Sequence, residues 1–218
     1  MSIARGTVGW WRFDGNLTDS SGNGNHGTVF SGTNGYAAGV YGQARDYGAG
    51  GDNVLLGKSP GGAGNKFTLS AWIKTGSTAQ NLSPFGGLND GSTTAIIIQT
   101  NRGSIDSGAL LFFLRKEGGN ALLLETAPGA HPNLEWFFLT ITNDEENMRI
   151  YINAVLRAEG ATPEGNLVDL TYGLGLGFSN NRGAVSSDFT GQIDNALIEN
   201  YARTPSQIKT LYALGSPL

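Results

Sequence analysis

The sequence predicts an all-β fold, a two-sheet antiparallel sandwich with one short helix at its C-terminal end. Glycine is the compositional outlier, with 34 among 218 residues and no collagen-like period. Glycine is favoured where tight turns need positive φ, so this content indicates many turns between short strands. Charged residues make up only 15%, which is low for a helical protein but acceptable for a sandwich.

Short apolar or alternating runs recur along the chain and are separated by turn residues. The predicted strands span residues 8–13, 54–56, 67–74, 95–100, 109–115, 121–125, 136–142, 148–153 and 192–200. The turn clusters between them include residues 19–25 and 59–65. Strands punctuated in this way are typical of a sandwich or barrel. We expect one domain over residues 1–218.

The clearest alternation lies in residues 148–153, where Met148, Ile150 and Ile152 share one face of a strand. Asn153-Ala154 then forms the predicted tip of a hairpin that returns through Val155. Alanine is a poor second residue for a tight turn with two positive φ angles. We therefore expect Asn153 to carry the left-handed conformation, or the turn to be of another type.

One helix is well signalled, at the C-terminal end. Thr204 is a good N-cap, Pro205 suits the first helical position and Gln207 completes a capping box. Gly215 can end the helix. The predicted apolar stripe comprises Ile208, Leu211 and Tyr212.

Composition argues against several classes of partner. The formal net charge is −4, from 14 basic and 18 acidic residues, and no dense basic cluster occurs. We therefore expect neither nucleic acid nor a membrane as partner. The most apolar run, residues 109–114, is far shorter than the ~20 residues that cross a bilayer. The chain has no cysteine, which excludes disulfides and thiolate chemistry.

Several segments together resemble the laminin G-like branch of the concanavalin A-like lectin and glucanase superfamily. They follow the order of that family along almost the whole chain, and they are residues 9–27, 42–54, 67–74, 136–155, 191–198 and the closing helix. The resemblance implies a concanavalin A-like jelly roll. One departure is Asn153-Ala154, where the family usually has Asp-Gly at the hairpin tip.

The first candidate site is a structural calcium site. Ca²⁺ prefers six to eight oxygen ligands from carboxylates, amides and carbonyls. The glycine-rich segment 14–26 supplies such oxygens, and the resemblance adds Asp194, because relatives often hold calcium between an early loop and this late strand. The expected ligands are Asp19, Asn25 and Asp194, with Asp14 as a further candidate. The alternative is that Asx and glycine residues only build turns here.

The second candidate site is a glycan-binding surface. Trp72 and Trp136 fall in strand patterns, so we expect them in the core. Loop residues are better candidates, because loops on rigid β scaffolds carry binding function. The candidates are Tyr36, Tyr41, Phe85, Asn89, Asp90, Asn101, Arg102, Asn181 and Arg182. The alternative is that they are ordinary solvated loop residues.

The sequence gives little support for catalysis. Retaining glycosidases need two carboxyl groups about 5–5.5 Å apart, and no strand carries the Glu-x-Asp-x-x-Glu run that would present them. Asp144, Glu145 and Glu146 lie in a predicted turn, where they point apart. Two histidines, His26 and His131, and no cysteine are too few for a zinc site.

Three functions follow as hypotheses. The first is a non-catalytic surface recognition or decoration module, in its specific form a phage virion protein that binds glycans or a capsid or tail lattice. It would act as a homo-oligomer or in repeated copies, and would be located in the virion after synthesis in the host cytoplasm. The second is a carbohydrate-binding or adhesion module of a larger secreted protein, and therefore extracellular. The third is a glycosidase or polysaccharide lyase.

Overall fold

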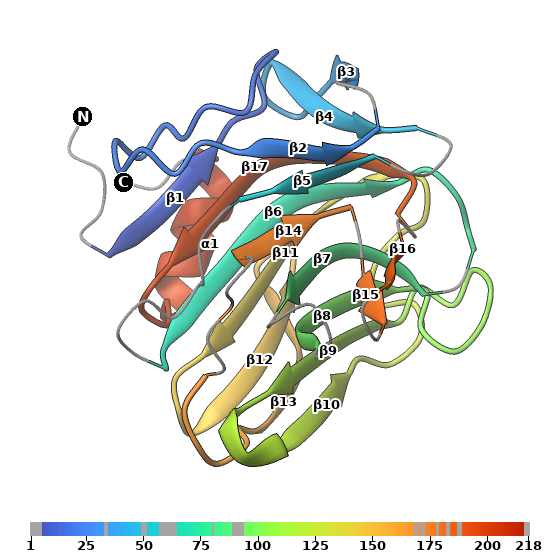
Figure 1. Ribbon diagram of the computed structural model, residues 1–218. Coiled ribbons are helices and arrows are strands. Elements are labelled where there is room, and N and C mark those ends of the chain that lie inside the picture. The colour runs from blue at the N-terminus through green and yellow to red at the C-terminus, as the bar shows by residue number, and fades with distance from the viewer. Residues whose placement is uncertain are drawn as a thin grey trace.

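The structure is a computed structural model of the chain. It describes residues 6–32, 35–48, 52–56, 65–79, 81–88, 94–167, 170, 173–177, 179–181, 184–186 and 189–215. Within these ranges two antiparallel sheets face each other, and a small hairpin and one helix accompany them (Figure 1). The predicted sandwich with a C-terminal helix is therefore confirmed.

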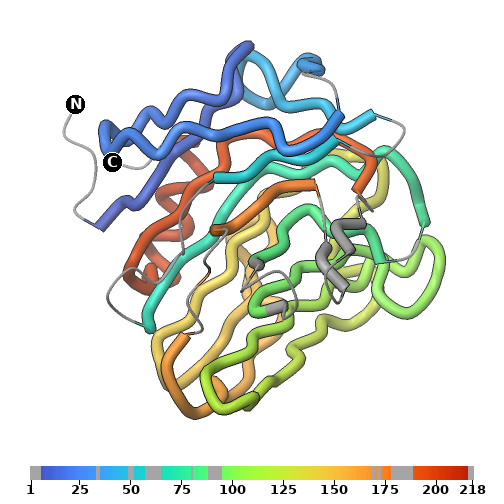
Figure 2. Tube along the Cα trace, in the orientation of Figure 1, coloured from blue at the N-terminus to red at the C-terminus, as the bar shows by residue number. Residues whose placement is uncertain are grey.

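Among the described residues, sheet A has eight strands. In spatial order they are β13 (Val155–Ala161), β12 (Asn147–Ile152), β11 (Trp136–Asn143), β6 (Phe67–Thr75), β17 (Gly191–Glu199), β4 (Gln43–Tyr47) and β3 (Gly35–Ala38), with β1 (Thr7–Trp11) paired to β17. Strands that are neighbours in space are often distant in sequence, so Figure 2 shows the chain crossing repeatedly between the two layers.

Sheet B has seven strands in the described part of the chain. In spatial order they are β10 (Ala121–Glu125), β9 (Leu110–Arg115), β8 (Thr94–Thr100), β7 (Leu82–Leu88), β14 (Gly173–Leu176), β5 (Asn53–Leu55) and β2 (Thr28–Ser31). A separate hairpin joins β15 (Ser179–Asn181) to β16 (Ala184–Ser186), and a short 3₁₀ turn η1 (Glu117–Gly119) precedes β10.

The main core lies between the two sheets. On β6, Phe67, Leu69 and Ile73 point into it, as the period-2 alternation of a strand requires. Facing residues from sheet B include Phe85 and Phe112, both buried. Phe67 and Phe112 meet edge to face, with ring centroids 6.3 Å apart.

A second, smaller apolar cluster covers the other face of sheet A. Trp72, Phe138 and Leu197 project from β6, β11 and β17 and pack under Leu211 of the C-terminal helix. The helix α1 (Pro205–Leu214) begins with the predicted capping box on Thr204 and ends at Gly215 in the left-handed conformation. Trp72 is therefore buried as expected, but outside the inter-sheet core.

The hairpin tip at Asn153-Ala154 confirms the expected left-handed conformation of Asn153, and Ala154 adopts it as well. Both residues have positive φ, at 51° and 61°, and the strands close directly on either side of them. The Asn153 side chain accepts a hydrogen bond from the Phe138 amide at 2.8 Å. This bond to the neighbouring strand fixes the turn even though alanine is unfavourable in it.

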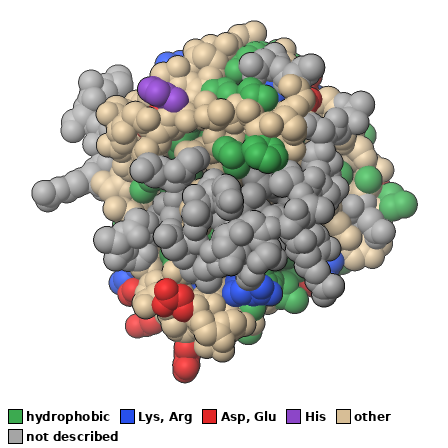
Figure 3. Space-filling view, viewed as in Figure 1, with side chains coloured by type: hydrophobic (Ala, Val, Ile, Leu, Met, Phe, Trp, Pro, Cys, Tyr) green, Lys and Arg blue, Asp and Glu red, His purple; other side chains and the backbone are tan. Residues whose placement is uncertain are grey.

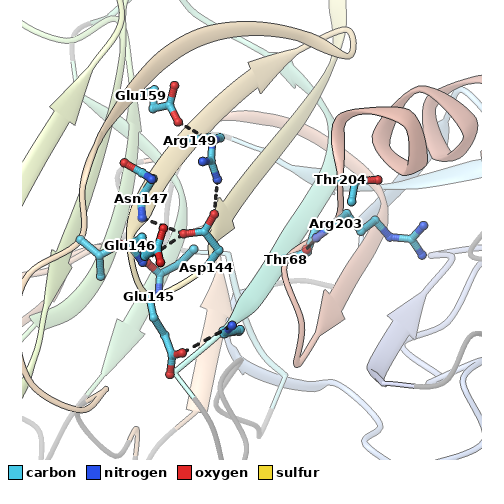
Figure 4. Close-up of polar contacts among 12 residues, drawn as sticks. Thr68, Asp144, Glu145, Glu146, Asn147, Arg149, Glu159, Arg203 and Thr204 are labelled. Atoms are coloured by element: carbon cyan, nitrogen blue, oxygen red, sulfur yellow. Dashed lines mark hydrogen bonds and ion pairs between the residues drawn. The ribbon is translucent and has the colours of Figure 1, made fainter.

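The turn between β11 and β12 is built around Asp144. Its Oδ1 accepts hydrogen bonds from the amides of Glu146 and Asn147, and its Oδ2 pairs with Arg149 at 2.5 Å (Figure 4). Glu145 pairs instead with Lys66, at 3.6 Å. The expected divergence is therefore confirmed for the carboxylates of Asp144 and Glu145.

A buried ion pair holds the junction between β17 and α1. Glu199 is fully buried, and Arg203 donates to its carboxylate through both Nε and Nη2. Thr68 of β6 accepts a hydrogen bond from the Arg203 amide at 2.9 Å and donates one to the Tyr201 carbonyl at 2.8 Å. Figure 4 shows Thr68 beside Arg203 at the start of the helix.

The surface is weakly charged overall. In the view of Figure 3, acidic and basic side chains gather along the lower margin, on the side where Figure 1 places β10 and β13. No described helix has the length and apolar character needed to cross a membrane.

Removing Arg203 should destabilise the domain strongly. Arg203→Ala removes the only charged partner of the buried Glu199 carboxylate within the described residues and leaves it the Tyr201 hydroxyl alone, a defect that costs about 3–5 kcal/mol. Urea denaturation measures the effect. The matched control is Lys66→Ala, which breaks an exposed pair and should change stability by less than about 1 kcal/mol. Equal losses in the two variants would contradict this account.

His131 should make the fold sensitive to mild acid. Its buried ring stacks on Phe137, with centroids 4.7 Å apart, and among the described residues its Nε2 has no hydrogen-bond partner. Burial lowers the pKa of His131, so the unfolded chain binds a proton that the folded chain resists. Stability should therefore fall as pH drops below about 6.5. His131→Phe keeps the aromatic stack and should make the free energy of unfolding, measured with urea, depend less on pH between about pH 7 and 5. An unchanged pH dependence would show that another group causes it.

Candidate functional site

A pocket opens at one end of sheet A, where β4, β6 and β17 end side by side. Its volume is about 510 Å³. It is lined by Asp46, Tyr47, Gly48, Lys74, Thr75, Gly76, Ser77, Thr190, Gly191 and Gln192. The pocket therefore lies on sheet A, away from the loops that the sequence indicated.

Three polar side chains form a row across the strands of this pocket. Gln192 of β17 stands opposite Asp46 of β4 on one side and Lys74 of β6 on the other. Residues directly opposite in an antiparallel ladder have Cβ atoms about 4.5–5.5 Å apart. The neighbouring residues Ile193 and Tyr47 are part of the core, so the row faces outward.

The row continues to an aromatic side chain. Trp136 of β11 stands opposite Lys74. The expectation that Trp136 lies in the core is wrong: it is half-buried on the outer face and packs against the cluster of Trp72 and Phe138. Tyr41, which is 38% exposed, approaches Trp72 edge-on with ring centroids 6.4 Å apart. The outer face of sheet A thus presents polar groups beside an aromatic surface.

The side chains of the row keep their hydrogen-bonding capacity. Asp46, Lys74 and Gln192 are half-buried, and their side chains make no hydrogen bond or ion pair within the described residues. A carboxylate, an ammonium group and an amide together supply both donors and acceptors. The row can therefore bind a ligand that carries many hydroxyl groups without first breaking internal bonds.

Close backbone approach shapes the floor of the pocket. At Gly191, φ is 139°, and a Cβ would lie 2.1 Å from the Lys74 carbonyl oxygen. Only glycine fits this position. The absence of side chains there leaves room above the strand ends.

Three of the sequence-predicted ligand residues have structural roles. Phe85 is wrongly predicted as a loop residue: it lies in β7 and is 1% exposed, in the core. Asn101 is fully buried and fixes a loop by accepting a hydrogen bond from the Gly108 amide at 3.0 Å. Arg102 pairs with Glu125 at 3.1 Å.

The remaining predicted ligand residues do not assemble into a site in the described structure. Tyr36 is half-buried in β3, with the buried Arg45 guanidinium 5.8 Å from its ring centroid. Asn181 belongs to β15. Asn89, Asp90 and Arg182 lie outside the described residues.

The early loop, one half of the predicted calcium site, is held by its own hydrogen bonds. The Asp19 carboxylate accepts from the amides of Trp10, Ser21 and Asn25 and from the Ser21 hydroxyl, at 2.8–3.0 Å. Burial, the largest single influence, raises the pKa of Asp19. The hydrogen bonds together outweigh it, so the pKa lies below its usual value. The Asn25 amide donates to the Val8 carbonyl at 2.7 Å. Asp19 and Asn25 therefore stabilise the loop through hydrogen bonds.

Asp194 and Asp14, the other predicted calcium ligands, accept hydrogen bonds from a different segment, residues 40–43. Asp194 accepts from the amides of Val40 and Tyr41 at 2.8 and 2.9 Å, and Asp14 accepts from the Gln43 amide at 3.0 Å. Burial raises the pKa of Asp194 to about 6, against hydrogen bonds from the amides of Tyr41, Val40 and Asn195. Within the described residues its Oδ1 is buried without a hydrogen bond of good geometry.

The predicted calcium ligands are therefore divided between two places. In the described part of the chain, no three acidic or histidine side chains are grouped so as to hold a metal ion. The second oxygen of Asp194 is the better candidate for a cation. Asp14 contacts the same turn through Oδ1, and its Oδ2 pairs with Arg12 at 2.8 Å, so an ion there would compete with Arg12. Asp19 and Asn25 do not fit, because their polar atoms are engaged within the loop.

Comparison with known proteins identifies the fold family. The family description "Concanavalin A-like lectin/glucanases superfamily" matches residues 47–209, which is more than half of the chain. A search of curated proteins found no match.

Solved structures show the same fold at low sequence identity. Domain 4 of AbnA, a GH43 extracellular arabinanase from Geobacillus stearothermophilus in complex with arabinotriose, has a TM-score of 0.71 and 22% identity, covering 95% of this chain and 98% of that one. The binding domain of Paraclostridial Mosquitocidal Protein 1 has a TM-score of 0.73 and 15% identity, covering 95% and 52%.

A structure of botulinum neurotoxin type C, described as dependent on two ganglioside molecules for cell entry, has a TM-score of 0.73 and 16% identity, covering 95% and 51%. The chain thus spans about half the length of these two toxin chains. The expected resemblance is confirmed by the family match, and the chain belongs to the concanavalin A-like lectin and glucanase superfamily.

Proposed function

We propose that this domain is a non-catalytic carbohydrate-binding module and that the row Asp46–Gln192–Lys74, with Trp136 beside it, contacts the sugar. The observation that carries the proposal is the row itself: three unengaged polar side chains in register across a pocket. Ligand sites typically combine a concave surface with a few convergent polar groups.

The chemistry of the row suits a saccharide. Sugar hydroxyls both donate and accept hydrogen bonds, which a carboxylate, an amide and an ammonium group can match. The C–H face of a sugar ring packs against an aromatic side chain such as Trp136, which has a large apolar surface. Four adjacent strands about 4.8 Å apart make the row about 14 Å long, which suits an oligosaccharide.

The solved relatives support a binding role. They include a domain of an arabinanase in complex with arabinotriose and a toxin that depends on gangliosides. The pocket lining contributes one carboxylate, Asp46, whereas glycoside hydrolysis uses two. Binding is therefore the better-supported function, and a glycosidase or lyase is the weaker alternative.

Two forms of the binding role remain predictions. A virion decoration protein and a module of a larger secreted protein would use the same surface. The relatives favour the general carbohydrate-binding role, in which the module of a larger secreted protein is the simpler form.

Substitutions in the row should weaken sugar binding without unfolding the domain. The ligand would first be found by screening immobilised arabino-oligosaccharides, β-glucan oligosaccharides and sialylated glycans. By calorimetry, Trp136→Ala should then cost about 2 kcal/mol or more, and Gln192→Ala and Lys74→Ala about 1 kcal/mol each.

The matched control for these variants is Lys209→Ala, on the exposed side of α1, which should bind like the wild type. Binding that survives all three substitutions in the row would move the site elsewhere. Reducing sugar released by the pure protein would contradict the non-catalytic role.

We further propose that Asp14 and Asp194 hold a structural calcium ion at the turn of residues 39–43. Such an ion would offset the charge of a carboxylate that is buried and incompletely paired. Because a ligand of the native state raises stability by mass action, EDTA should lower the melting temperature and Ca²⁺ should restore it. Asp194→Asn should abolish this response.

The control for calcium is Asp19→Asn, which weakens the early loop and should keep the response to EDTA. Melting that is unaffected by EDTA and Ca²⁺ would rule out the ion. Loss of the response in Asp19→Asn alone would return the site to the early loop.

A further inference from the structure

Strand β10 forms an unprotected edge of sheet B. It ends the sheet (Figure 1), and its sequence is Ala-Leu-Leu-Leu-Glu. Leu122 is 42% exposed and Leu123 is 57% exposed. Natural sheets usually protect their edges with charge, proline, bulges or very short strands, because an exposed apolar edge pairs readily with another strand.

Other described edges carry such protection, and β1, which among the described strands pairs only with β17, is covered by hydrogen bonds between Trp10 and both Asp19 and Ser20 of the early loop. Strand β13 contains Arg157 and Glu159, and a register irregularity lies between β12 and β13. Strands β2 and β3 have four residues each, and β2 also has an irregular register. Strand β10, in contrast, pairs with β9 through five consecutive residue pairs without a register irregularity.

The backbone of β10 offers a defined set of free hydrogen-bonding groups. Lys116 donates to the Asn120 carbonyl and Thr126 donates to the Leu110 carbonyl. Because hydrogen-bonded pairs alternate along an antiparallel ladder, residues 120, 122, 124 and 126 face β9. The N–H and C=O groups of Ala121, Leu123 and Glu125 therefore point outward, and they have no partner within the described residues.

We propose that this edge pairs with β10 of a second copy of the chain, around a two-fold axis at Leu123. In this antiparallel register Leu123 stands opposite the partner's Leu123, and Ala121 stands opposite the partner's Glu125. All three outward-facing residues of each strand then form hydrogen-bonded pairs. The two seven-stranded sheets join into one continuous sheet.

Side chains on the outer face of sheet B match this register. Leu123 lies opposite Phe113 in β9, so the two-fold axis brings two leucines together between two half-buried phenylalanines. The small Ala121 lies between Arg115 and the partner's Glu125. The two long side chains can meet over it, and opposite charges in this arrangement favour pairing.

Arg115 is suited to that contact. Its guanidinium lies 5.3 Å from the Phe113 ring centroid, and its buried Nε has no hydrogen-bond partner in the part of the chain that the structure describes. The Glu125 carboxylate has an exposed contact to Arg102 through one oxygen, which leaves the other available. This complementarity is symmetric, since each copy supplies one Arg115 and one Glu125, and it favours a second copy over an unrelated strand.

The start of β10 contacts the segment that follows β13, where the Asn120 side chain donates to the Glu164 carbonyl at 3.4 Å. A second pocket of about 300 Å³ opens along this edge, between residues Asn120–Leu122 and Thr162–Glu164. A dimer formed here would also display two copies of the pocket on sheet A. Linked sites raise avidity by roughly 10²–10⁴ without new contacts.

Sedimentation equilibrium of the wild type and of Leu123→Lys tests the dimer. The wild type should dimerise reversibly across a dilution series, and Leu123→Lys should be monomeric with a native circular dichroism spectrum, because lysine is a typical edge-protecting residue. The matched control is Val155→Lys, at a site on β13 that is 51% exposed, and it should dimerise like the wild type.

A single-cysteine variant tests the register, since the chain has no cysteine of its own. In a hydrogen-bonded antiparallel pair the Cα atoms are about 5.5 Å apart, within the range of a disulfide. Mild oxidation of Leu123→Cys should therefore yield a covalent dimer. Leu122→Cys, one residue along on the other face, should not cross-link.

Two results would overturn the proposal. One is a wild-type chain that stays monomeric at every concentration, which would leave the edge for a strand of another protein. The other is a dimer that persists in Leu123→Lys or that cross-links through Leu122→Cys, which would place the interface elsewhere.

Discussion

Strand β6 has both of its faces buried, and the rest of the structure depends on this constraint. One face, with Leu69 and Ile73, packs into the core between the sheets, and the other carries Trp72 under the C-terminal helix. A slip of one residue would exchange the two faces. The pairing with β11 and β17 is therefore fixed, and it is this pairing that aligns Lys74 with Gln192 and Trp136.

The sequence was sufficient to predict the strands whose apolar and polar residues alternate regularly, and the helix with its capping residues. It missed β7, because Pro84 and two glycines indicate a loop, although the strand is held by β8 and β14 on either side. The row in the pocket was missed for a different reason. Its members lie on strands far apart in sequence, so only the register brings Asp46 beside Gln192. The sequence offered one indication of the row: residues 68–74 alternate between the two faces of the strand, which places Lys74 on the face away from the inter-sheet core.

Local pattern also could not separate turn building from ligand binding. Asp19 and Asp194 are similar as acidic residues of family-like segments, yet their carboxylates differ in how far they are satisfied. Asp19 accepts four hydrogen bonds from β1 and its own loop, whereas Asp194 has one buried oxygen that lacks a partner among the described residues. That difference depends on three-dimensional contacts, and it makes Asp194 the better candidate for a cation.

The central claim is that the polar row on sheet A binds saccharide. Nuclear magnetic resonance of the ¹⁵N-labelled protein, titrated with the best oligosaccharide from a glycan screen, tests it most directly. The account predicts that the largest shift changes occur at the amides of Gly76 and Gly191, the Gln192 side chain and the Trp136 indole, which line or adjoin the pocket. Changes confined to sheet B, for example at Ile97 and Phe113, would contradict it.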